Sequence, residues 1–477
     1  MVAQGLLAPL AITPTLAPSP MPRLAYVLAA AAAVLPLAFA AQLPSDEPVL
    51  PSTPFDYDGI ELPAHLQAAA VQNTDNTPDD NVLTDAGATL GRVLFYDSRL
   101  SQNGSVSCAS CHVQANGFSD PSRFSAGFEG GLTGRNSMGL AFSRYYASGH
   151  AFWDERAGSF EEQALMPIQD PVEMGMTLDE VVARIDGTPF YGPLFADAFG
   201  TDEVTPERIG KALAQFARSI VPFDTRYDEG RALQPPGPPG QTPLSTLTES
   251  ENRGMAIFFG PARCSMCHAG DLFVLPEPAN NGLDSTITDE GAGDGRFKSP
   301  SLRNIGLTAP YMHDGRFATL EEVLDHYDSG IKESPSLDPR LDGRGLNLTE
   351  QEKADVIAFL HTLTDESLAT DVRWSDPFAI ENAAEPTAPS LAARFDAPFP
   401  NPARGAVTLR YALAQPGHAT LAVYDVTGRR VALLADGWQR ADEQTARWDA
   451  SGLAAGVYVA RLTTPGGTQT HRVTVVR

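Results

Sequence analysis

The sequence predicts a mainly α-helical protein that ends in a small all-β domain. Up to about residue 365, apolar residues recur with the 3.6-residue period of helices. Several of these segments begin with Thr followed three residues later by Glu, the capping-box pattern of a helix N-terminus. Beyond about residue 395 the pattern changes to short runs rich in Val, Thr and Tyr, which are typical of strands. We therefore expect helical domains first and a β-sandwich last.

The helices can be placed in chain order from their caps and apolar stripes. Leu90, Val93 and Leu94 have helical spacing and indicate a first long helix. Thr205 and Pro206 supply a cap and a first-turn proline before an apolar stripe at positions 209, 213, 216 and 220. Capping boxes open four further helices, at Thr177 with Glu180, Thr248 with Glu251, Thr319 with Glu322, and Thr349 with Glu352. The stripe of the last helix ends near residue 363.

Two short segments, residues 108–112 and 264–268, each read C-x-x-C-H. This is the attachment pattern of c-type haem, in which two thiols form thioethers with the cofactor and the next histidine ligates the iron. A zinc site or a redox dithiol is the alternative, but neither explains both histidines together with all four cysteines. The expected attachment residues are Cys108, Cys111, Cys264 and Cys267, and the expected iron ligands are His112 and His268. The fold class is thus mainly α, with two cytochrome c-like haem domains followed by a small all-β sandwich domain.

Changes in composition divide the 477-residue chain into parts. Residues 42–82 are rich in Pro, Asp and Asn, residues 234–241 consist mostly of Pro and Gly, and residues 365–389 are polar and rich in Pro and Ala. We expect an N-terminal extension with a signal peptide (1–40), an irregular lead-in (41–82), an N-terminal cytochrome c domain (83–240), a C-terminal cytochrome c domain (241–366), a linker (367–394) and a β-sandwich (395–477).

The net charge concerns the possible binding partners, and the N-terminal sequence concerns the cellular location. The formal net charge of −25 argues against nucleic acid and against an anionic membrane surface as partners. Arg23 precedes an apolar run, residues 24–39, that ends in an A-x-A cleavage pattern at residues 38–40. Residues 1–20 lack the charged beginning of a signal peptide, so translation can start at Met1 or at Met21. We expect export across the inner membrane, which suits haem attachment outside the cytoplasm.

Five further motifs surround the haem segments. They are LGRVLFYDSRL (90–100) before the first, FWDER (152–156) and PVEM (171–174) between the two, and PSLRN (300–304) and PYMHDG (310–315) after the second. With them, about residues 80–365 resemble the bacterial di-haem cytochrome c peroxidase and MauG family. The resemblance implies that the N-terminal domain holds the peroxidatic haem and that the C-terminal domain holds an electron-transfer haem, which receives electrons from a donor.

The resemblance also implies roles for individual residues. Trp153 matches the tryptophan on the electron route between the haems. Glu173 matches the distal glutamate, which can move a proton between the two oxygens of peroxide, and Gln163 matches the glutamine that accompanies it. A calcium ion is expected between the domains, and its ligands match Asn136, Thr308 and Pro310, the last two through backbone oxygens.

Two positions depart from the pattern of the typical di-haem peroxidase. The histidine that blocks the peroxide iron until the second haem is reduced is replaced by Phe128, so we expect the first iron to be open at rest. His150 lies beyond that loop and is not expected to take its place. The methionine ligand of the second iron is replaced by Tyr327, as in MauG-type proteins, and an oxygen ligand lowers the reduction potential. Met312 and His326 are the alternative ligands.

The C-terminal domain has a resemblance of its own. Strands are expected at residues 407–411, 420–424, 456–462 and 472–476, with a turn at 427–428. With FPNP (399–402), VYDV (423–426) and AGVYV (455–459), the domain resembles the type IX secretion sorting domain. This implies the type IX secretion machinery as a partner and a cell-surface or extracellular location, with the periplasm as the alternative. An accessory β module that binds carbohydrate or packs on the enzyme is the other interpretation.

The expected function is the reduction of hydrogen peroxide to water with electrons from a small redox protein, a cytochrome c or a cupredoxin. One alternative is a MauG-like di-haem oxidase that modifies residues of a partner protein. Another is a di-haem electron carrier without peroxide chemistry. A homodimer is compatible with the resemblance.

Overall fold

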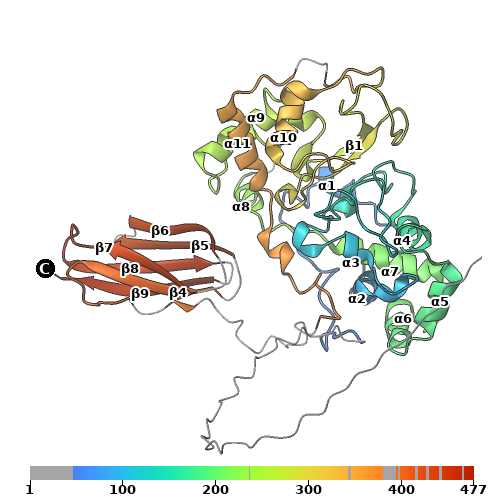
Figure 1. The fold of residues 1–477 in the computed structure, drawn as a ribbon, viewed down its shortest axis with the longest axis horizontal. Coiled ribbons are helices and arrows are strands. Elements are labelled where there is room, and N and C mark those ends of the chain that lie inside the picture. The colour runs from blue at the N-terminus through green and yellow to red at the C-terminus, as the bar shows by residue number, and fades with distance from the viewer. Residues whose placement is uncertain are drawn as a thin grey trace, which may run out of the picture. The chain divides into compact units, whose positions relative to one another are not determined.

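The computed structural model describes residues 47–235, 237–341, 345–379, 394–395, 398–413, 417–425, 429–439, 443–464 and 467–476. The expected signal peptide, residues 380–393 of the expected linker and the turn at 427–428 lie outside these residues. The chain is mainly helical up to residue 379 and forms strands from residue 394 onward (Figure 1). Among the described helices, none combines the length and the apolar character needed to cross a membrane.

The first helical half is organised around α2 (Asp85–Tyr96) and α7 (Pro206–Ser219), which pack against each other. Its other helices are α1 (Ala69–Gln72), α3 (Cys108–Cys111), α4 (Phe160–Gln169), α5 (Leu178–Asp186) and α6 (Tyr191–Phe199), whereas α8 (Arg226–Ala232) packs its Tyr227 into the core of the second half. The crossing of α2 and α7 needs Gly91, because a Cβ there would lie 2.0 Å from the carbonyl oxygen of Ala212. The expected stripe on α7 is confirmed, since Ile209, Leu213 and Phe216 are buried in the core.

The second helical half contains the same kind of close helix crossing. It consists of α9 (Glu249–Phe259), α10 (Leu320–Asp325) and α11 (Glu350–His361), with a two-stranded antiparallel sheet of β1 (Leu275–Ala279) and β2 (Phe297–Ser299). Helix α9 crosses α11 at Gly254, where a Cβ would lie 1.9 Å from the carbonyl oxygen of Asp355. In each half, therefore, a glycine in the helix before the C-x-x-C-H segment allows a close helix crossing that the rest of the core packs around.

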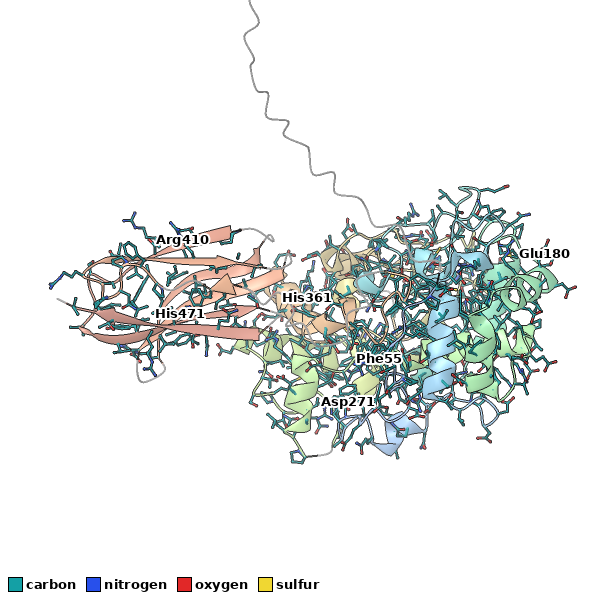
Figure 2. All side chains as sticks on the ribbon, turned by 90° about the horizontal axis from the view of Figure 1, so that it is seen from below. Phe55, Glu180, Asp271, His361, Arg410 and His471 are labelled. Carbon is teal, nitrogen blue, oxygen red and sulfur yellow. The ribbon has the colours of Figure 1, made fainter. Side chains whose placement is uncertain are left out.

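All four expected capping boxes are confirmed, at the starts of α5, α9, α10 and α11. In each, the Thr hydroxyl accepts from the backbone N–H of the Glu, and the Glu carboxylate accepts from the backbone N–H of the Thr. Glu180, the acidic member of the first box, is labelled in Figure 2. Satisfying these terminal N–H groups fixes where each helix begins.

The expected linker starts later than its composition indicates. Residues 367–379 pack against the first helical half, where Leu368, Trp374 and Phe378 join the core. Arg92 donates to the carbonyl oxygen of Val372 at 2.9 Å, and Tyr96 donates to that of Trp374 at 2.7 Å. This stretch is part of the folded unit, so the boundary expected at residue 367 moves to about residue 379.

The C-terminal strands form two antiparallel sheets. One has the order β3 (Arg394–Phe395), β4 (Ala406–Ala412) and β7 (Glu443–Asp449), and the other has β6 (Arg430–Gln439), β5 (Gly417–Asp425), β8 (Gly456–Thr464) and β9 (Gly467–Val475). Leu409 and Trp448 of the first sheet share one buried core with Leu421 and Leu462 of the second. The four expected strands are confirmed as β4, β5, β8 and β9, while β3, β6 and β7 were not expected.

Candidate functional site

The first C-x-x-C-H segment is held by a short helix and a tight turn. Helix α3 begins at Cys108 and ends at Cys111, and His112 is its C-cap residue. The His112 Nδ1 lies 2.9 Å from the carbonyl oxygen of Phe118, which is held at a left-handed φ of 60°. A proton on Nδ1 donates to this carbonyl, so Nε2 is left as a neutral ligand atom. Burial also lowers the pKa of His112, which favours the same neutral form.

The second segment repeats this arrangement. Cys264 begins a 3₁₀ turn, and the His268 Nδ1 lies 3.4 Å from the carbonyl oxygen of Phe273, whose φ is 53°. Burial lowers the pKa of His268 to about 4. It also raises the pKa of both Cys108 and Cys264 to about 12, whereas a redox dithiol needs a lowered thiol pKa. Both segments thus present a neutral imidazole and two neutral thiols, which fit thioether-linked haem better than dithiol chemistry.

Each segment lines a cavity. The first cavity, of about 500 Å³, contains Cys108, Cys111 and His112 in its wall, and the second, of about 240 Å³, contains Cys264, Cys267 and His268. Apolar side chains supply much of both walls, including Phe95 and Leu213 in the first, and Phe258 and Leu360 in the second. A flat, largely apolar cofactor with a histidine-ligated iron fits both donor sets.

The two polar residues that the family resemblance assigns to peroxide chemistry line the first cavity. Gln163 of α4 and Glu173, from the loop that follows it, both line this cavity with His112. The Asp170 carboxylate shapes the loop by accepting from the backbone N–H groups of Val172 and Glu173. Burial, and then the charge of Asp170, raises the pKa of Glu173, while Arg156 opposes this shift. A buried carboxyl whose pKa is raised is suited to move protons.

The wall between the two cavities is shared. Trp153, Asn136 and Lys298 each line both cavities. The Trp153 indole N–H donates to the carbonyl oxygen of Asn136 at 2.8 Å, and the Trp153 carbonyl accepts from the backbone N–H of Lys298 at 2.8 Å. An aromatic ring fixed by these bonds therefore lies in the partition between the two candidate haem sites.

Comparison with known proteins agrees with this geometry. The family profile described as di-haem cytochrome c peroxidase matches residues 85–233. The methylamine utilization protein MauG of Methylorubrum extorquens is 38% identical over 307 residues, which cover 61% of this chain and 82% of that protein. The cytochrome c551 peroxidase of Nitrosomonas europaea is 32% identical over 303 residues, which cover 58% of this chain and 80% of that protein. The chain belongs to the di-haem cytochrome c peroxidase and MauG family.

A solved structure and a second profile extend this assignment. The crystal structure of a MauG-like protein associated with microbial copper homeostasis is 37% identical, covers 67% of this chain and 97% of its own, and has a TM-score of 0.55. The profile of the secretion system C-terminal sorting domain matches residues 397–476. The chain thus combines a di-haem enzyme of this family with a type IX sorting domain.

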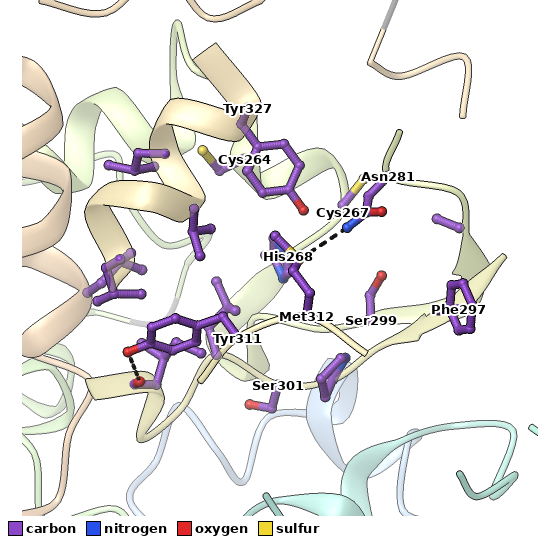
Figure 3. Close-up of a pocket in the computed structure, with 18 of the residues that line it drawn as sticks. Cys264, Cys267, His268, Asn281, Phe297, Ser299, Ser301, Tyr311, Met312 and Tyr327 are labelled. Atoms are coloured by element: carbon purple, nitrogen blue, oxygen red, sulfur yellow. Dashed lines mark hydrogen bonds between the residues drawn. The ribbon is translucent and has the colours of Figure 1, made fainter. Parts of the chain in front are cut away.

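The second cavity of this di-haem enzyme contains two candidate iron ligands (Figure 3). Tyr327 lies in the turn of π-helix at His326–Gly330, and burial raises the pKa of its hydroxyl to about 12. Asn281 hydrogen-bonds to this hydroxyl, and its Nδ2 donates to the Met312 sulfur at 3.3 Å. His326 is turned away to the carbonyl oxygen of Asn281, at 3.0 Å, and is not in the wall of this cavity. Of the three residues considered as ligands of the second iron, Tyr327 and Met312 line this cavity and His326 does not.

The loop that closes the first iron in typical di-haem peroxidases contains Phe128 here. The Phe128 N–H donates to the carbonyl oxygen of Glu173 at 3.0 Å, and its ring packs on Gly175. Phe128 is not among the described residues that line the first cavity, and neither is His150. The half-exposed His150 ring instead faces Glu155, with Nδ1 3.6 Å from Oε2.

The three residues matched to a calcium site share one cavity wall. Asn136, Thr308 and Pro310 all line the second cavity. The Asn136 side chain is 4% exposed, and its Nδ2 donates to the carbonyl oxygens of Asp120 and Ser122. The amide oxygen is therefore the side-chain atom that can serve a cation, and oxygen donors of this kind suit calcium.

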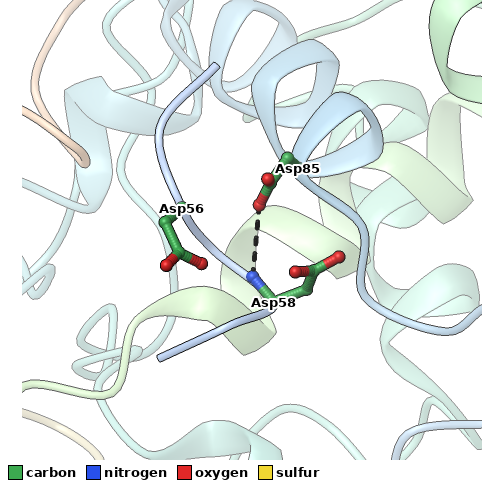
Figure 4. A group of neighbouring side chains, drawn as sticks. All are labelled: Asp56, Asp58 and Asp85. Carbon is green, nitrogen blue, oxygen red and sulfur yellow. Dashed lines mark hydrogen bonds between the residues drawn. The ribbon is translucent and has the colours of Figure 1, made fainter. Parts of the chain in front are cut away.

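Another group of carboxylates has a structural explanation. Asp56, Asp58 and Asp85 have oxygens within 4.8 Å of one another (Figure 4). Asp85 is the first residue of α2, and its carboxylate accepts from the backbone N–H groups of Tyr57 at 2.7 Å and Asp58 at 3.3 Å. These bonds fasten the lead-in to the start of α2, where a negative charge is favourable.

Several residues near the cavities were not expected from the sequence. Asn281 lies in a loop and Lys298 lies in β2, and no local sequence pattern marks either of them. His313 also lines the second cavity, whereas His361 is exposed at the end of α11 and His471 lies on β9 (Figure 2).

Proposed function

We propose that this enzyme reduces hydrogen peroxide to water at the first haem site, with electrons that a small redox protein delivers through the second. The observation that carries the proposal is that Glu173 and Gln163 share one cavity with His112 and the first cysteine pair. The family assignment supports haem-based peroxide chemistry in general. The donor would be a cytochrome c or a cupredoxin.

The first haem would supply an iron that binds peroxide and takes part in its reduction. The Glu173 carboxylate accepts a proton from one peroxide oxygen and returns it to the other, which leaves as water. Because burial raises its pKa, the Glu173 carboxylate accepts this proton more readily than an exposed glutamate would. The Gln163 amide can donate a hydrogen bond in the same cavity and orient the peroxide. Two electrons and two further protons complete the conversion of one peroxide into two waters.

Electrons cross the partition between the two cavities. Trp153 lines both, and its hydrogen bond to the carbonyl of Asn136 fixes the orientation of the ring. A calcium ion held by Asn136, Thr308 and Pro310 would tie the two halves together at the same place. The route therefore depends on residues whose positions are set by contacts between the halves.

A MauG-like oxidase that modifies a partner protein is the second candidate. It is favoured by Tyr327, whose hydroxyl enters the second cavity beside Asn281, because an oxygen ligand stabilises oxidised iron relative to a thioether. The identity to MauG of Methylorubrum extorquens agrees with it. The two candidates share peroxide chemistry at the first site and differ in what supplies the electrons.

The deciding experiment mixes the ferric holoenzyme with hydrogen peroxide in a stopped-flow spectrometer and then adds a reduced small cytochrome c. We expect an immediate spectral change without prior reduction, followed by fast oxidation of the cytochrome. A fast first reaction with slow turnover and a lasting oxidised state would favour the MauG-like oxidase. A ferric protein that is inert to peroxide until one electron is added would contradict the open first site, and no reaction in any state would leave an electron carrier.

The sorting domain would direct the enzyme to the cell surface or the medium. We expect a chain that lacks residues 380–477 to remain an active two-haem enzyme and to accumulate in the periplasm of its native host, because residues 367–379 belong to the catalytic part. Cell fractionation with haem staining and a peroxide assay measures both. Loss of activity with unchanged export would instead indicate that the β domain serves the reaction.

A further inference from the structure

A tyrosine in the wall of the first cavity is hydrogen-bonded to a carboxylate behind it, and neither residue has been given a role above. Tyr146 is 2% exposed and lines this cavity with His112 and Glu173. Its hydroxyl donates to the Oε1 of Glu155. The buried phenol therefore has a proton acceptor in place, in contact with the space where peroxide would react.

This pair continues to the protein surface. The Glu155 side chain is 12% exposed, and its Oε2 lies 3.6 Å from the Nδ1 of His150. The His150 side chain is 46% exposed. A proton that reaches Glu155 can thus pass to His150 and on to solvent, so the chain of groups connects the buried hydroxyl to bulk water.

A buried lysine lies over the ring of the same tyrosine. The Lys298 Nζ is 3.8 Å from the centroid of the Tyr146 ring and donates to the carbonyl oxygen of His150 at 2.9 Å. Burial lowers the pKa of Lys298 to about 7, so its amino group is charged mainly below neutral pH. When it is charged, removal of an electron from the ring without loss of the phenol proton would place two positive charges side by side, which favours transfer of that proton together with the electron.

Trp153 differs from Tyr146 in the group that accepts its hydrogen bond. Its indole N–H donates to the peptide carbonyl of Asn136, which is a hydrogen-bond acceptor but not a base. An oxidised Trp153 would have to keep its proton and remain a cation in the partition that also contains Lys298. Such a ring can pass an electron on quickly but is poorly suited to hold an oxidising equivalent, whereas Tyr146 with Glu155 is suited to hold one.

We propose that Tyr146 is a redox-active residue that reduces the oxidised first haem site by one electron and holds the oxidising equivalent as a neutral tyrosyl radical. In this step the O–H bond of Tyr146 breaks, its proton moves to the Glu155 carboxylate, and its electron moves to the oxidised first site. A later electron from the donor, with the proton returned by Glu155, restores the phenol. The inference rests on the proposed function only in requiring that a peroxide oxidises the first site.

The test is rapid-freeze electron paramagnetic resonance of the ferric holoenzyme after it is mixed with hydrogen peroxide in the absence of any electron donor. We expect a tyrosyl radical whose hyperfine pattern changes when the protein contains ring-deuterated tyrosine. Tyr146→Phe should lose this signal. The matched control is Tyr145→Phe, because Tyr145 is also 2% exposed but is outside the lining of the first cavity, and it should keep the signal. Glu155→Gln, which can still accept the hydrogen bond but not the proton, should lower the radical yield.

Two readouts separate this inference from the proposed function. Haem content and the ferric spectrum show whether each variant has folded with both cofactors. A peracid replaces hydrogen peroxide in a parallel series, since it oxidises a ferric haem without the proton transfer assigned to Glu173. Peroxide turnover in the wild type with no radical that depends on Tyr146 in either series would overturn the inference alone. A Tyr146 radical with the peracid but no turnover of hydrogen peroxide would support it and overturn the proposed function.

Discussion

The two haem cavities share one half of their design and differ in the other. On the histidine side they are alike, since each follows a glycine-mediated helix crossing and each histidine faces the carbonyl of a phenylalanine with positive φ. In the rest of their walls, the first cavity presents Glu173 and Gln163, whereas the second presents Tyr327 and Met312. The segments that bind the cofactor are thus repeated, and function is assigned by the segments that follow them.

The difference teaches where specialisation lies in this fold. In the first half, the loop after α4 brings the Glu173 carboxyl group to the cavity, and the Phe128 ring packs on Gly175. In the second half, the turn after α10 brings a hydroxyl that can fill the ligand position. This difference is what the proposed function requires, in which the first site admits peroxide and the second exchanges electrons.

The largest effect is expected when the haem of the second cavity is removed. Cys264→Ala together with Cys267→Ala should reduce the haem content from two to one and abolish peroxide turnover driven by a reduced cytochrome, because the electron-receiving haem is lost. Pyridine haemochrome analysis and mass spectrometry measure the haem count. Haem that acid-acetone extracts from the wild type would contradict covalent attachment, and Ser265→Ala serves as the control within the same turn.

The next test concerns the proton-transfer group of the first cavity. Glu173→Gln should keep both haems and slow peroxide reduction by roughly 10²- to 10⁴-fold, the usual contribution of a general acid–base group. Steady-state kinetics with a reduced cytochrome measure the effect. Glu129→Gln is the matched control, because Glu129 is exposed in the neighbouring loop. Nearly normal turnover in Glu173→Gln would assign this residue to structure.

A third test addresses the second cavity. Tyr327→Phe should convert the second haem from low-spin to high-spin in the ferric protein and should slow electron delivery, while the first site still reacts with peroxide. Electron paramagnetic resonance and the visible spectrum report the spin state. Met312→Leu should leave the spectrum unchanged, and the opposite result for the two variants would identify Met312 as the ligand.

The smallest expected effect is a shift in pH dependence. Glu173 must be ionised to accept a proton, and its pKa is raised, so kcat/KM should fall as the pH drops through a value above that of an ordinary glutamate. Arg156 lowers this pKa, so Arg156→Gln should move the acidic limb to higher pH by less than about one unit. A pH–rate profile for kcat/KM measures it, with Arg208→Gln on α7 as the control. An unchanged or lowered limb in Arg156→Gln would show that another group controls the profile.

Local patterns predicted much of this molecule. Capping boxes, helical stripes and the two C-x-x-C-H segments act within a few residues, so their outcome could be foreseen. Trp374 and Phe378 are buried by contacts with helices nearly three hundred positions away in sequence, and their polar, Pro-rich surroundings resemble a linker. Strand β7 reads as a polar segment because one side of the two-faced sheet meets solvent. Asn281 and Lys298 reach their cavities only through tertiary packing, which no local signal records.

The first and last described segments of the enzyme part lie next to each other, and this arrangement bears on how such proteins acquire new cellular locations. The Val49 N–H donates to the carbonyl oxygen of Pro377 at 2.7 Å, so the first and last described segments of the enzyme meet. A module whose ends are adjacent and already bonded can gain or lose a neighbour in the gene without opening its core. Recombination after residue 379 would therefore exchange the sorting domain without removing a residue of the helical core.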